Sequence, residues 1–576
     1  MASVYDRFLK QRLSRRRLLA GAGGAAMGTA GLVLLGCGDG GGNGGNGGNG
    51  GVTPIAGTPT EASLPRSGGT LTFGSTTSTV FGVDPQTEIA LGLLIFPRVY
   101  GYLIHQNPRD DTVFFDQAAN LETPTESEYI FTIRDDVRYQ AVTFPDQPDV
   151  GARNVEARDV VATIRRLLAN PLVSLPKTLF TEILEEPEAR DPRTVYMQTR
   201  MPYVYTFEGL GSIFSVIIPE ELTDLNVVEN LNFGGVGSGP YIVESVNGQE
   251  EIRIRKNPDY FRKPVPYVDN MVFRVIPDTG TIEANFRSQA IDAFSPSDAL
   301  QAERVAQFTS GGHEAIVTES PNLAYVSFGM DVTQPPFNNI KAREAISLAI
   351  DREELIEKIT FGTGAILGPV NQHLRDGFWA LPEDELRRAY GMDLPKEERL
   401  QKARDLMIEA GVEGANIELK YPQLTNISAA AVLVQQQLQA VGFQVSLVGE
   451  SLILWFIQTL RQGNFHATLH AHLPYETPNI PTRYFHSKGV PSTESWHHYA
   501  NPDVDALIER HWGEFDENVR RATLLELQRL ILAEHGPMLN LYTGKNRAAY
   551  WSYLKDWKRE LPGSMQQYVY DNWLDT

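Results

Sequence analysis

The chain has one cysteine among 576 residues. A disulfide framework needs at least two thiols, and zinc or iron–sulfur sites built on thiolates need several, so the composition excludes both classes. Beyond residue 68 the chain also lacks an apolar run long enough to cross a membrane and a repeat of solenoid period. Positive charge is scarce, because 51 Lys and Arg stand against 71 Asp and Glu, for a net charge of −20. Such a surface repels nucleic acid, which is therefore not an expected partner.

Signatures of catalysis are missing as well. The chain contains no Walker loop, no His-Glu-x-x-His zinc helix and no Gly-x-Ser-x-Gly nucleophile elbow. Gly362 and Gly364 begin a glycine pattern of the dinucleotide-binding kind, but the next glycine, Gly368, is misplaced, so we predict a turn. A carboxylate pair for glycoside hydrolysis is defined by distance in space and stays open at this point. We expect no cofactor.

The first residues have the composition of an export signal. Ser14 and the arginines at 15–17 precede an uncharged run, 18–36, that holds six Gly and five Ala. This pattern resembles a bacterial twin-arginine signal peptide, whose apolar region is only mildly hydrophobic. A transmembrane helix is the alternative, since a run of this length could just span a bilayer. The run ends in Leu34-Leu35-Gly36-Cys37, which matches the lipobox of bacterial lipoproteins and implies that Cys37 is acylated and becomes the mature N-terminus.

Residues 37–67 are predicted to be a flexible tether. Between 38 and 51 the sequence holds ten Gly, three Asn and one Asp, from which no packed core can form. A flexible chain of about 30 residues has a root-mean-square reach of about 30 Å. Signal peptide, acyl site, tether and folded body follow in the order expected of an extracytoplasmic protein of the cell envelope that is lipid-anchored to the membrane.

The folded body mixes two periodicities. Tyr129, Phe131 and Ile133 alternate with more polar residues, which predicts a half-buried strand. Apolar residues at helical spacing predict helices over 342–350 and 400–410. A further helix is predicted to end at Gly442, and an alternating strand follows it. Helix, glycine and strand in succession indicate an α/β protein.

Three histidines are candidates for a metal site. His466, His470 and His472 would share one face of a strand over 465–472, and imidazoles are good ligands for Zn or Ni. His466 and His470 would lie about 13 Å apart in such a strand, too far for one ion. Only His470 and His472 could cooperate, so we expect solvated or pocket-lining histidines and no metal.

A series of ordered motifs resembles the family 5 extracellular solute-binding proteins, which serve peptide- and nickel-type ABC importers. The resemblance covers about residues 68 to 560, and its most specific part is Gly237-Ser238-Gly239-Pro240-Tyr241 followed by Lys256-Asn257-Pro258-Asp259-Tyr260-Phe261. The other matching segments are 131–137, where Asp136 stands in place of a typical glycine, 154–168, 273–278, 291–293, 335–337 and 343–352.

The resemblance implies a fold and its division. The fold would be α/β, a two-lobe periplasmic-binding-protein-like arrangement with an extra inserted domain and a strand hinge near 323–328 and 541. Lobe I would comprise residues 68–108, 216–322 and 541–576, the inserted domain 109–215 and lobe II 323–540. The protein would be a monomer that captures a solute between its lobes and delivers it to the permease and ATPase subunits of an ABC importer, without acting as an enzyme.

The resemblance also implies the ligand site. Tyr475 falls where well-known oligopeptide binders have an Asp for the peptide amino terminus, and Leu460 and Leu469 fall where they have pocket arginines. We therefore predict an aromatic, weakly polar wall, with a peptide as the first ligand and an oligosaccharide or a metal chelate as alternatives. An exported enzyme such as a hydrolase, and a ligand sensor without transport, are the alternative functions. The predicted ligand-binding residues are Phe81, Lys177, Trp455, His472, Tyr475, Glu476 and Tyr542, although Phe81 and Trp455 are also typical core residues.

Overall fold

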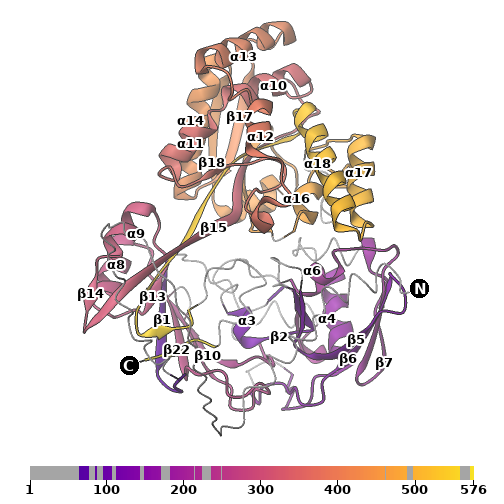
Figure 1. Cartoon of the computed structure of the whole chain (residues 1–576), viewed down its shortest axis with the longest axis vertical. Coiled ribbons are helices and arrows are strands. Elements are labelled where there is room, and N and C mark those ends of the chain that lie inside the picture. The colour runs from indigo at the N-terminus through magenta and orange to yellow at the C-terminus, as the bar shows by residue number, and fades with distance from the viewer. Residues whose placement is uncertain are drawn as a thin grey trace, which may run out of the picture.

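The computed structural model describes residues 64–76, 85–86, 95–106, 112–142, 148–169, 182–212, 215–223, 235–247, 250–460, 462–475, 477–489, 497–557 and 571–575. These residues form two lobes that are joined by long strands along one side of the molecule (Figure 1). The predicted signal peptide, Cys37 and the predicted tether up to residue 63 lie outside the described residues.

One mixed sheet runs through both lobes. Its strands are β1 (Thr70–Ser75), β10 (Tyr241–Asn247), β11 (Glu251–Lys256), β12 (Asn270–Val275), β13 (Ala293–Phe294), β14 (Thr309–Ser310), β15 (His313–Met330), β16 (Ala365–Ile366), β17 (Asn416–Pro422), β18 (Gln444–Glu450), β19 (Ala467–His472) and β20 (Met538–Trp551). They pair in the order β10-β11-β12-β1-β13-β20-β15-β19-β17-β18, with β14 on β15 and β16 on β20. The first lobe is built on β1 and β10–β13, and the second on β17–β19.

The first lobe has an aromatic core at the end of the long strands. Phe286 stacks on Trp551 with ring centroids 4.7 Å apart, and both side chains are fully buried. Asp278 and Asp298 begin its two longer helices, because each side chain accepts a backbone N–H of the first turn. The helices are α3 (Phe96–Val99), α8 (Thr279–Arg287) and α9 (Ala299–Val305), and two small sheets pair β2 (Gly101–Tyr102) with β9 (Val216–Ile217) and β21 (Leu554–Lys555) with β22 (Trp573–Leu574).

A second, separate sheet lies between residues 112 and 212, and we call these residues the small-sheet region. Tyr129, Phe131 and Ile133 are fully buried on one side of it, which confirms the strand that their alternation predicts. Its strands are β5 (Ala118–Glu122), β6 (Glu128–Ile133), β7 (Glu188–Asp191) and β8 (Thr194–Gln198), in the order β5-β6-β8-β7. Around it lie β3 (Ile104–Gln106), β4 (Val113–Phe115), α4 (Ala157–Ala169), α6 (Thr206–Leu210) and η3 (Glu220–Leu222).

Buried hydrogen bonds attach the small-sheet region to the first lobe. Gln140 Nε2 donates to the carbonyl of Tyr241 at 2.7 Å, and Gln117 Nε2 donates to Ser238 Oγ at 2.6 Å. Asp116 accepts the backbone N–H of Tyr102 at 2.8 Å. Because leaving a buried polar group without its hydrogen bond costs free energy, these contacts attach the small-sheet region to the first lobe.

Two adjacent strands, β15 and β20, cross from one lobe to the other. They pair antiparallel from Ala315 opposite Trp551 to Gly329 opposite Met538, and the register shifts between Pro321 and Tyr325. At this shift, Thr543 Oγ1 is within hydrogen-bond distance of the carbonyls of Asn322 and Ala324, at 2.7 and 2.6 Å. This register shift lies between the lobes. The strands would have to bend at this place if the lobes changed their orientation.

Helices cover the sheet of the second lobe. Gly411 and Gly442 have φ of +66° and +115° and end α13 and α14, which confirms the stops predicted from the sequence. The predicted helix over 342–350 corresponds to α10, which begins at the capping residue Asn339. The helical elements are α10 (Ile340–Ala349), α11 (Arg352–Ile359), η4 (Leu374–Gly377), α12 (Glu383–Ala389), α13 (Lys396–Ala410), α14 (Thr425–Val441), α15 (Leu452–Leu454), η5 (Trp455–Leu460), α16 (Asn479–Arg483), α17 (Pro502–Trp512) and α18 (Glu517–Ala533).

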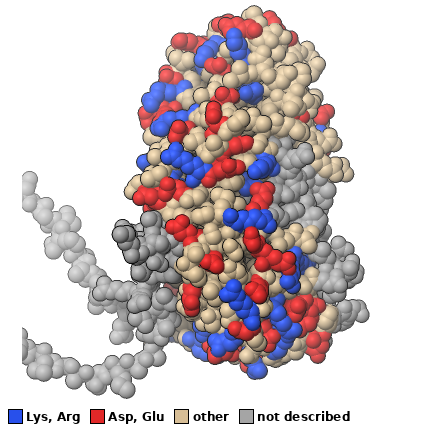
Figure 2. Space-filling model, turned by 90° about the vertical axis from the view of Figure 1, so that its right-hand side faces the viewer, with Lys and Arg blue, Asp and Glu red and all other residues tan. Residues whose placement is uncertain are grey.

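Figure 2 shows the face that carries α17, α18 and β7, where acidic and basic side chains are interspersed over both lobes. Within the described ranges, no helix combines the length and the apolar character that crossing a bilayer requires.

Candidate functional site

One face of the second lobe's sheet carries aromatic and polar side chains. β15 and β19 pair antiparallel, with Tyr325 opposite His472 and Ser327 opposite His470. Side chains alternate along a strand, and directly opposite residues share a face, so these four side chains project to the same side of the sheet. Val326 and Phe328 project to the other side, into the apolar core under α10 and α14.

The rings on the polar face form a stack. The Tyr325 and His472 rings are nearly parallel with centroids 4.1 Å apart, and the His472 and His470 rings follow at 3.7 Å. Trp455 closes the stack edge-on against His470 at 5.5 Å, and its Nε1 donates to Thr468 Oγ1 at 2.9 Å. We call Tyr325, His472, His470 and Trp455 the aromatic stack.

Two tyrosines extend the stack on one side. The hydroxyls of Tyr475 and Tyr484 are 2.6 Å apart, and the Tyr484 ring lies edge-on to His472 at 5.0 Å. Burial, together with the neighbouring Tyr475 hydroxyl, raises the pKa of Tyr325 and Tyr484 well above the usual range, and burial raises the pKa of Tyr475 as well. The three phenols are therefore protonated and uncharged at any physiological pH.

The histidines of the stack are uncharged too. Burial is the first cause that lowers the pKa of His470 and His472 well below the usual value of 6.5, and the nearby imidazoles lower it further. Ser327 Oγ lies 2.7 Å from His472 Nε2 and fixes the orientation of that ring. In the described part of the chain, no charged side chain forms a hydrogen bond or ion pair with Tyr325, His472 or Tyr475.

The Tyr325 hydroxyl and His472 Nδ1 are polar atoms of the stack that are buried without a hydrogen-bond partner among the described residues. Buried polar groups nearly always find a partner, so each unpaired atom calls for a specific explanation. An uncharged polar group of a bound molecule would satisfy either atom.

A family model for the bacterial extracellular solute-binding proteins, family 5 (middle region), matches residues 118–492. The chain belongs to this family. The oligopeptide-binding protein AppA of Bacillus subtilis is 25% identical over 346 residues, which are 56% of this chain and 59% of AppA. The match thus spans less than two thirds of that relative's length.

Solved structures share the fold of this family 5 protein. The periplasmic binding protein DppA of Helicobacter pylori in complex with the peptide STSA superposes with a TM-score of 0.73 and 20% identity, covering 89% of this chain and 99% of that one. The binding protein AgaA from A. tumefaciens R10, in complex with agropinic acid, gives a TM-score of 0.71 and 19% identity over 88% of this chain and 99% of that one. These likenesses show the two-lobe fold.

The structure brings together only some of the residues predicted for the site. Trp455, His472 and Tyr475 lie in or beside the aromatic stack. Tyr542 stands opposite Val326 in the ladder and packs in the apolar core on the other side of the sheet. Phe81, Lys177 and Glu476 lie outside the described residues.

Tyr325, Ser327 and Tyr484 were not among the predicted residues. The alternation of Tyr325, Ser327 and Gly329 with apolar residues along β15 is the one signal in the sequence that could have indicated the first two. Tyr484 follows the short helix α16, and its contact with His472 depends on tertiary packing.

His466, the third histidine considered for a metal site, lies just before β19, and its Nε2 is 2.7 Å from the Pro335 carbonyl oxygen. The described residues contain no group of three side chains able to hold a metal ion.

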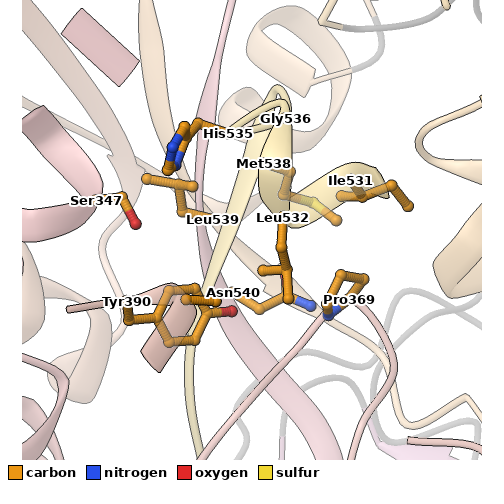
Figure 3. Close-up of a pocket in the computed structure, with 11 residues that line it drawn as sticks. Ser347, Pro369, Tyr390, Ile531, Leu532, His535, Gly536, Met538, Leu539 and Asn540 are labelled. Carbon is orange, nitrogen blue, oxygen red and sulfur yellow. The ribbon is translucent and has the colours of Figure 1, made fainter. Parts of the chain in front are cut away.

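A small pocket in the second lobe is distinct from the aromatic stack (Figure 3). It is lined by Ser347, Pro369, Ala389, Tyr390, Ile531, Leu532, His535, Gly536, Met538, Leu539 and Asn540. Beside it, fully buried Arg352 donates to the carbonyls of Ser347 and Asn540 at 3.0 and 3.2 Å, and its guanidinium lies 3.6 Å from the Tyr390 ring centroid. These bonds join α10 and α11 to β20. Arg352, the last residue of the 343–352 motif, therefore has a structural role.

Proposed function

We propose that the protein is a lipid-anchored, extracytoplasmic receptor that captures a solute between its two lobes and delivers it to an ABC importer. Membership of a solute-binding family and the two-lobe fold support this role. Ligand binding would favour the closed arrangement of the lobes, and the permease and ATPase subunits would take the solute from that form. Capture and release involve no covalent step, so we infer a binding protein that is not an enzyme and needs no cofactor. We propose that it acts as a monomer.

A peptide is the ligand class that we propose first. AppA is named an oligopeptide-binding protein, and the Helicobacter DppA structure holds a peptide. AgaA holds agropinic acid on the same fold, which therefore accommodates ligands other than peptides, and we keep an oligosaccharide or a metal chelate as a second choice.

The uncharged aromatic stack is the observation that carries the ligand preference. An ammonium or carboxylate group of a ligand loses hydration when it is buried, and a neutral wall returns no opposite charge. Aromatic side chains suit apolar side chains and sugar rings, and the Tyr325 hydroxyl and His472 Nδ1 can each meet a neutral polar group. We therefore expect apolar peptides or oligosaccharides to bind better than charged tripeptides.

Thermal-shift screening of three panels tests this proposal: charged tripeptides, apolar peptides and oligosaccharides. A ligand at 100 times its dissociation constant stabilises the native state by about 2.7 kcal/mol, which is easily measured. Tyr475→Ala should weaken binding of the best ligand, while Tyr196→Ala, in the small-sheet region, should not. A preference for charged tripeptides would overturn the proposed wall, and so would a folded Tyr475→Ala protein with unchanged affinity.

Anchoring and export have a test of their own. We propose that the twin-arginine-type signal 1–36 is removed and that Cys37 is acylated, because the only thiol of the chain follows two leucines and a small residue. Cell fractionation of Cys37→Ser should then find the protein released from the membrane. If the variant stays membrane-bound, residues 18–36 act as a transmembrane helix instead.

The division into domains is also a proposal. We keep lobe I at 68–108, 216–322 and 541–576, the inserted domain at 109–215 and lobe II at 323–540. The attachment of the small-sheet region to Ser238 and Tyr241 supports treating it as an insertion that moves with lobe I.

A further inference from the structure

The lobes meet at a second place, away from the strand crossing. Figure 1 shows α17 and α18 of the second lobe above α6 of the small-sheet region, on the side of the molecule opposite β15 and β20. Backbone groups touch there, since the N–H of Val204 donates to the carbonyl of Trp512 at 2.9 Å. The two bodies are therefore in direct contact here as well as at the strand crossing.

Polar side chains are paired across this contact. The Tyr203 hydroxyl donates to Asn479 Oδ1 at 3.0 Å, and Asn479 Nδ2 donates to Glu208 Oε2 at 3.0 Å. Arg483, which has no exposed surface, forms an ion pair with Glu182. We call Glu182, Tyr203, Glu208, Asn479 and Arg483 the clasp.

Aromatic packing surrounds these bonds. The Tyr203 ring lies edge-on to Trp512 at 6.1 Å, and the Arg483 guanidinium lies 5.0 Å from the centroid of the same indole. His511 sits deeper in the contact, with Nδ1 at 3.2 Å from the Tyr205 hydroxyl and Nε2 at 3.1 Å from Thr482 Oγ1. Tyr203 is 1% exposed and Asn479 is 4% exposed, so separating the bodies would expose groups that are now dry.

Opening of the lobes has to break this contact. The small-sheet region is fixed to the first lobe by the buried bonds of Gln140, Gln117 and Asp116, whereas the clasp residues Asn479 and Arg483 belong to the second lobe. A rotation about β15 and β20 leaves the first set intact and separates the second. The energy of the clasp is thus part of the difference between the closed and open forms.

We propose that the clasp sets the closed-to-open ratio of the protein, and through it the affinity for solute, without contacting the solute. This extends the proposed function, because a ligand that binds only the closed form gains apparent affinity in proportion to the population of that form. The Arg483–Glu182 pair contributes little by itself, since desolvation offsets most of its attraction. The neutral bonds of Tyr203 and Asn479 and the packing on Trp512 carry the larger share.

Distance measurement on the ligand-free protein tests the clasp directly. Spin labels are placed at Glu188→Cys in the small-sheet region and Arg510→Cys in the second lobe, both exposed, in full-length protein with Cys37→Ser. Removing the clasp with Glu182→Gln and Tyr203→Phe should lower the ratio of short to long distances about tenfold, which corresponds to about 1.4 kcal/mol. The matched control, Glu186→Gln with Tyr196→Phe, makes the same chemical changes within the small-sheet region and should leave the ratio unchanged.

A variant on the other body guards against a local folding effect. Asn479→Ala removes both of the amide's bonds across the contact and should shift the ratio in the same direction. Unchanged distances in the clasp variants, an equal shift in the control, or a wild type with long distances only would each overturn the proposal. The measurement needs no ligand, so its outcome is independent of whether a peptide is ever found to bind.

Discussion

The two faces of β15 and β19 differ although alternate residues of the same two strands build them. Val326, Phe328 and Leu469 point into an apolar core, and Tyr325, Ser327, His470 and His472 point the other way into the aromatic stack. The apolar face removes hydrocarbon from water and stabilises the fold. The other face buries hydroxyls and imidazoles, and it leaves the Tyr325 hydroxyl and His472 Nδ1 without a partner among the described residues. The sheet thus packs an apolar core on one side and carries on the other side the polar atoms that we propose for the ligand.

The largest expected effect is on the apolar face. Phe328 has no exposed surface, and Phe328→Ala should lower the free energy of unfolding by about 3 to 5 kcal/mol, because it leaves a cavity under α10 and α14. Denaturant-induced unfolding measures this loss. A loss below 1 kcal/mol would mean that the core collapses around the gap and that the faces differ less than we infer.

The next largest effect is expected from low pH, which should destabilise the folded protein through the histidines of the polar face. Burial holds the pKa of His470 and His472 well below 6.5. Below pH 6.5 these histidines are therefore protonated in the unfolded chain and neutral in the folded protein. The contribution of each histidine to the free energy of unfolding is complete above about pH 6.5. It decreases as the pH falls, by about 2 kcal/mol between pH 7 and pH 5.

Replacing one histidine isolates its share of the acid effect. His472→Gln should reduce the slope of the unfolding free energy against pH near pH 5. The reduction should correspond to about one proton fewer taken up on unfolding. Ser327→Ala is the matched control, since it removes the bond to His472 and keeps the titrating group. Equal slopes for wild type and His472→Gln would show that His472 accepts a proton in the folded state.

A smaller effect is expected at Tyr325. Tyr325→Phe removes a hydroxyl that has no partner among the described residues, so the stability of the free protein should change by less than about 0.5 kcal/mol. If ligand satisfies that hydroxyl, the dissociation constant of the best ligand should rise about five- to tenfold, as loss of one hydrogen bond predicts. Isothermal titration of both proteins makes the comparison, and identical affinities would place the ligand elsewhere.

The smallest effect is expected at Tyr542. Its ring is on the apolar face, opposite Val326, so Tyr542→Phe should leave ligand affinity unchanged. The same titration checks this. A clear loss of affinity would show that the ligand reaches both faces of the sheet and would remove the contrast between them.

The sequence indicated the fold further than it indicated the site. Local periodicity predicted the strand at Tyr129–Ile133 and the ends of α13 and α14 at Gly411 and Gly442, because those signals lie within one element. The stacking of His470 and His472 also follows from local alternation. The place of Tyr542 could not follow, since it depends on the pairing of β20 with a strand more than 200 residues away and on a shift of register within that ladder.

The crossing of β15 and β20 has a consequence for how such chains can be recombined. The chain enters the second lobe beside the point where it leaves, since Val326 and Tyr542 are neighbours in the ladder. Residues 326–542 thus form a cassette whose two ends meet and which is joined covalently to the remainder by two adjacent backbone connections, while the clasp adds noncovalent contacts. A homologous cassette with another ligand preference could be exchanged there with two junctions and the clasp residues to match, and a reporter domain inserted at this point would sense the angle between the lobes.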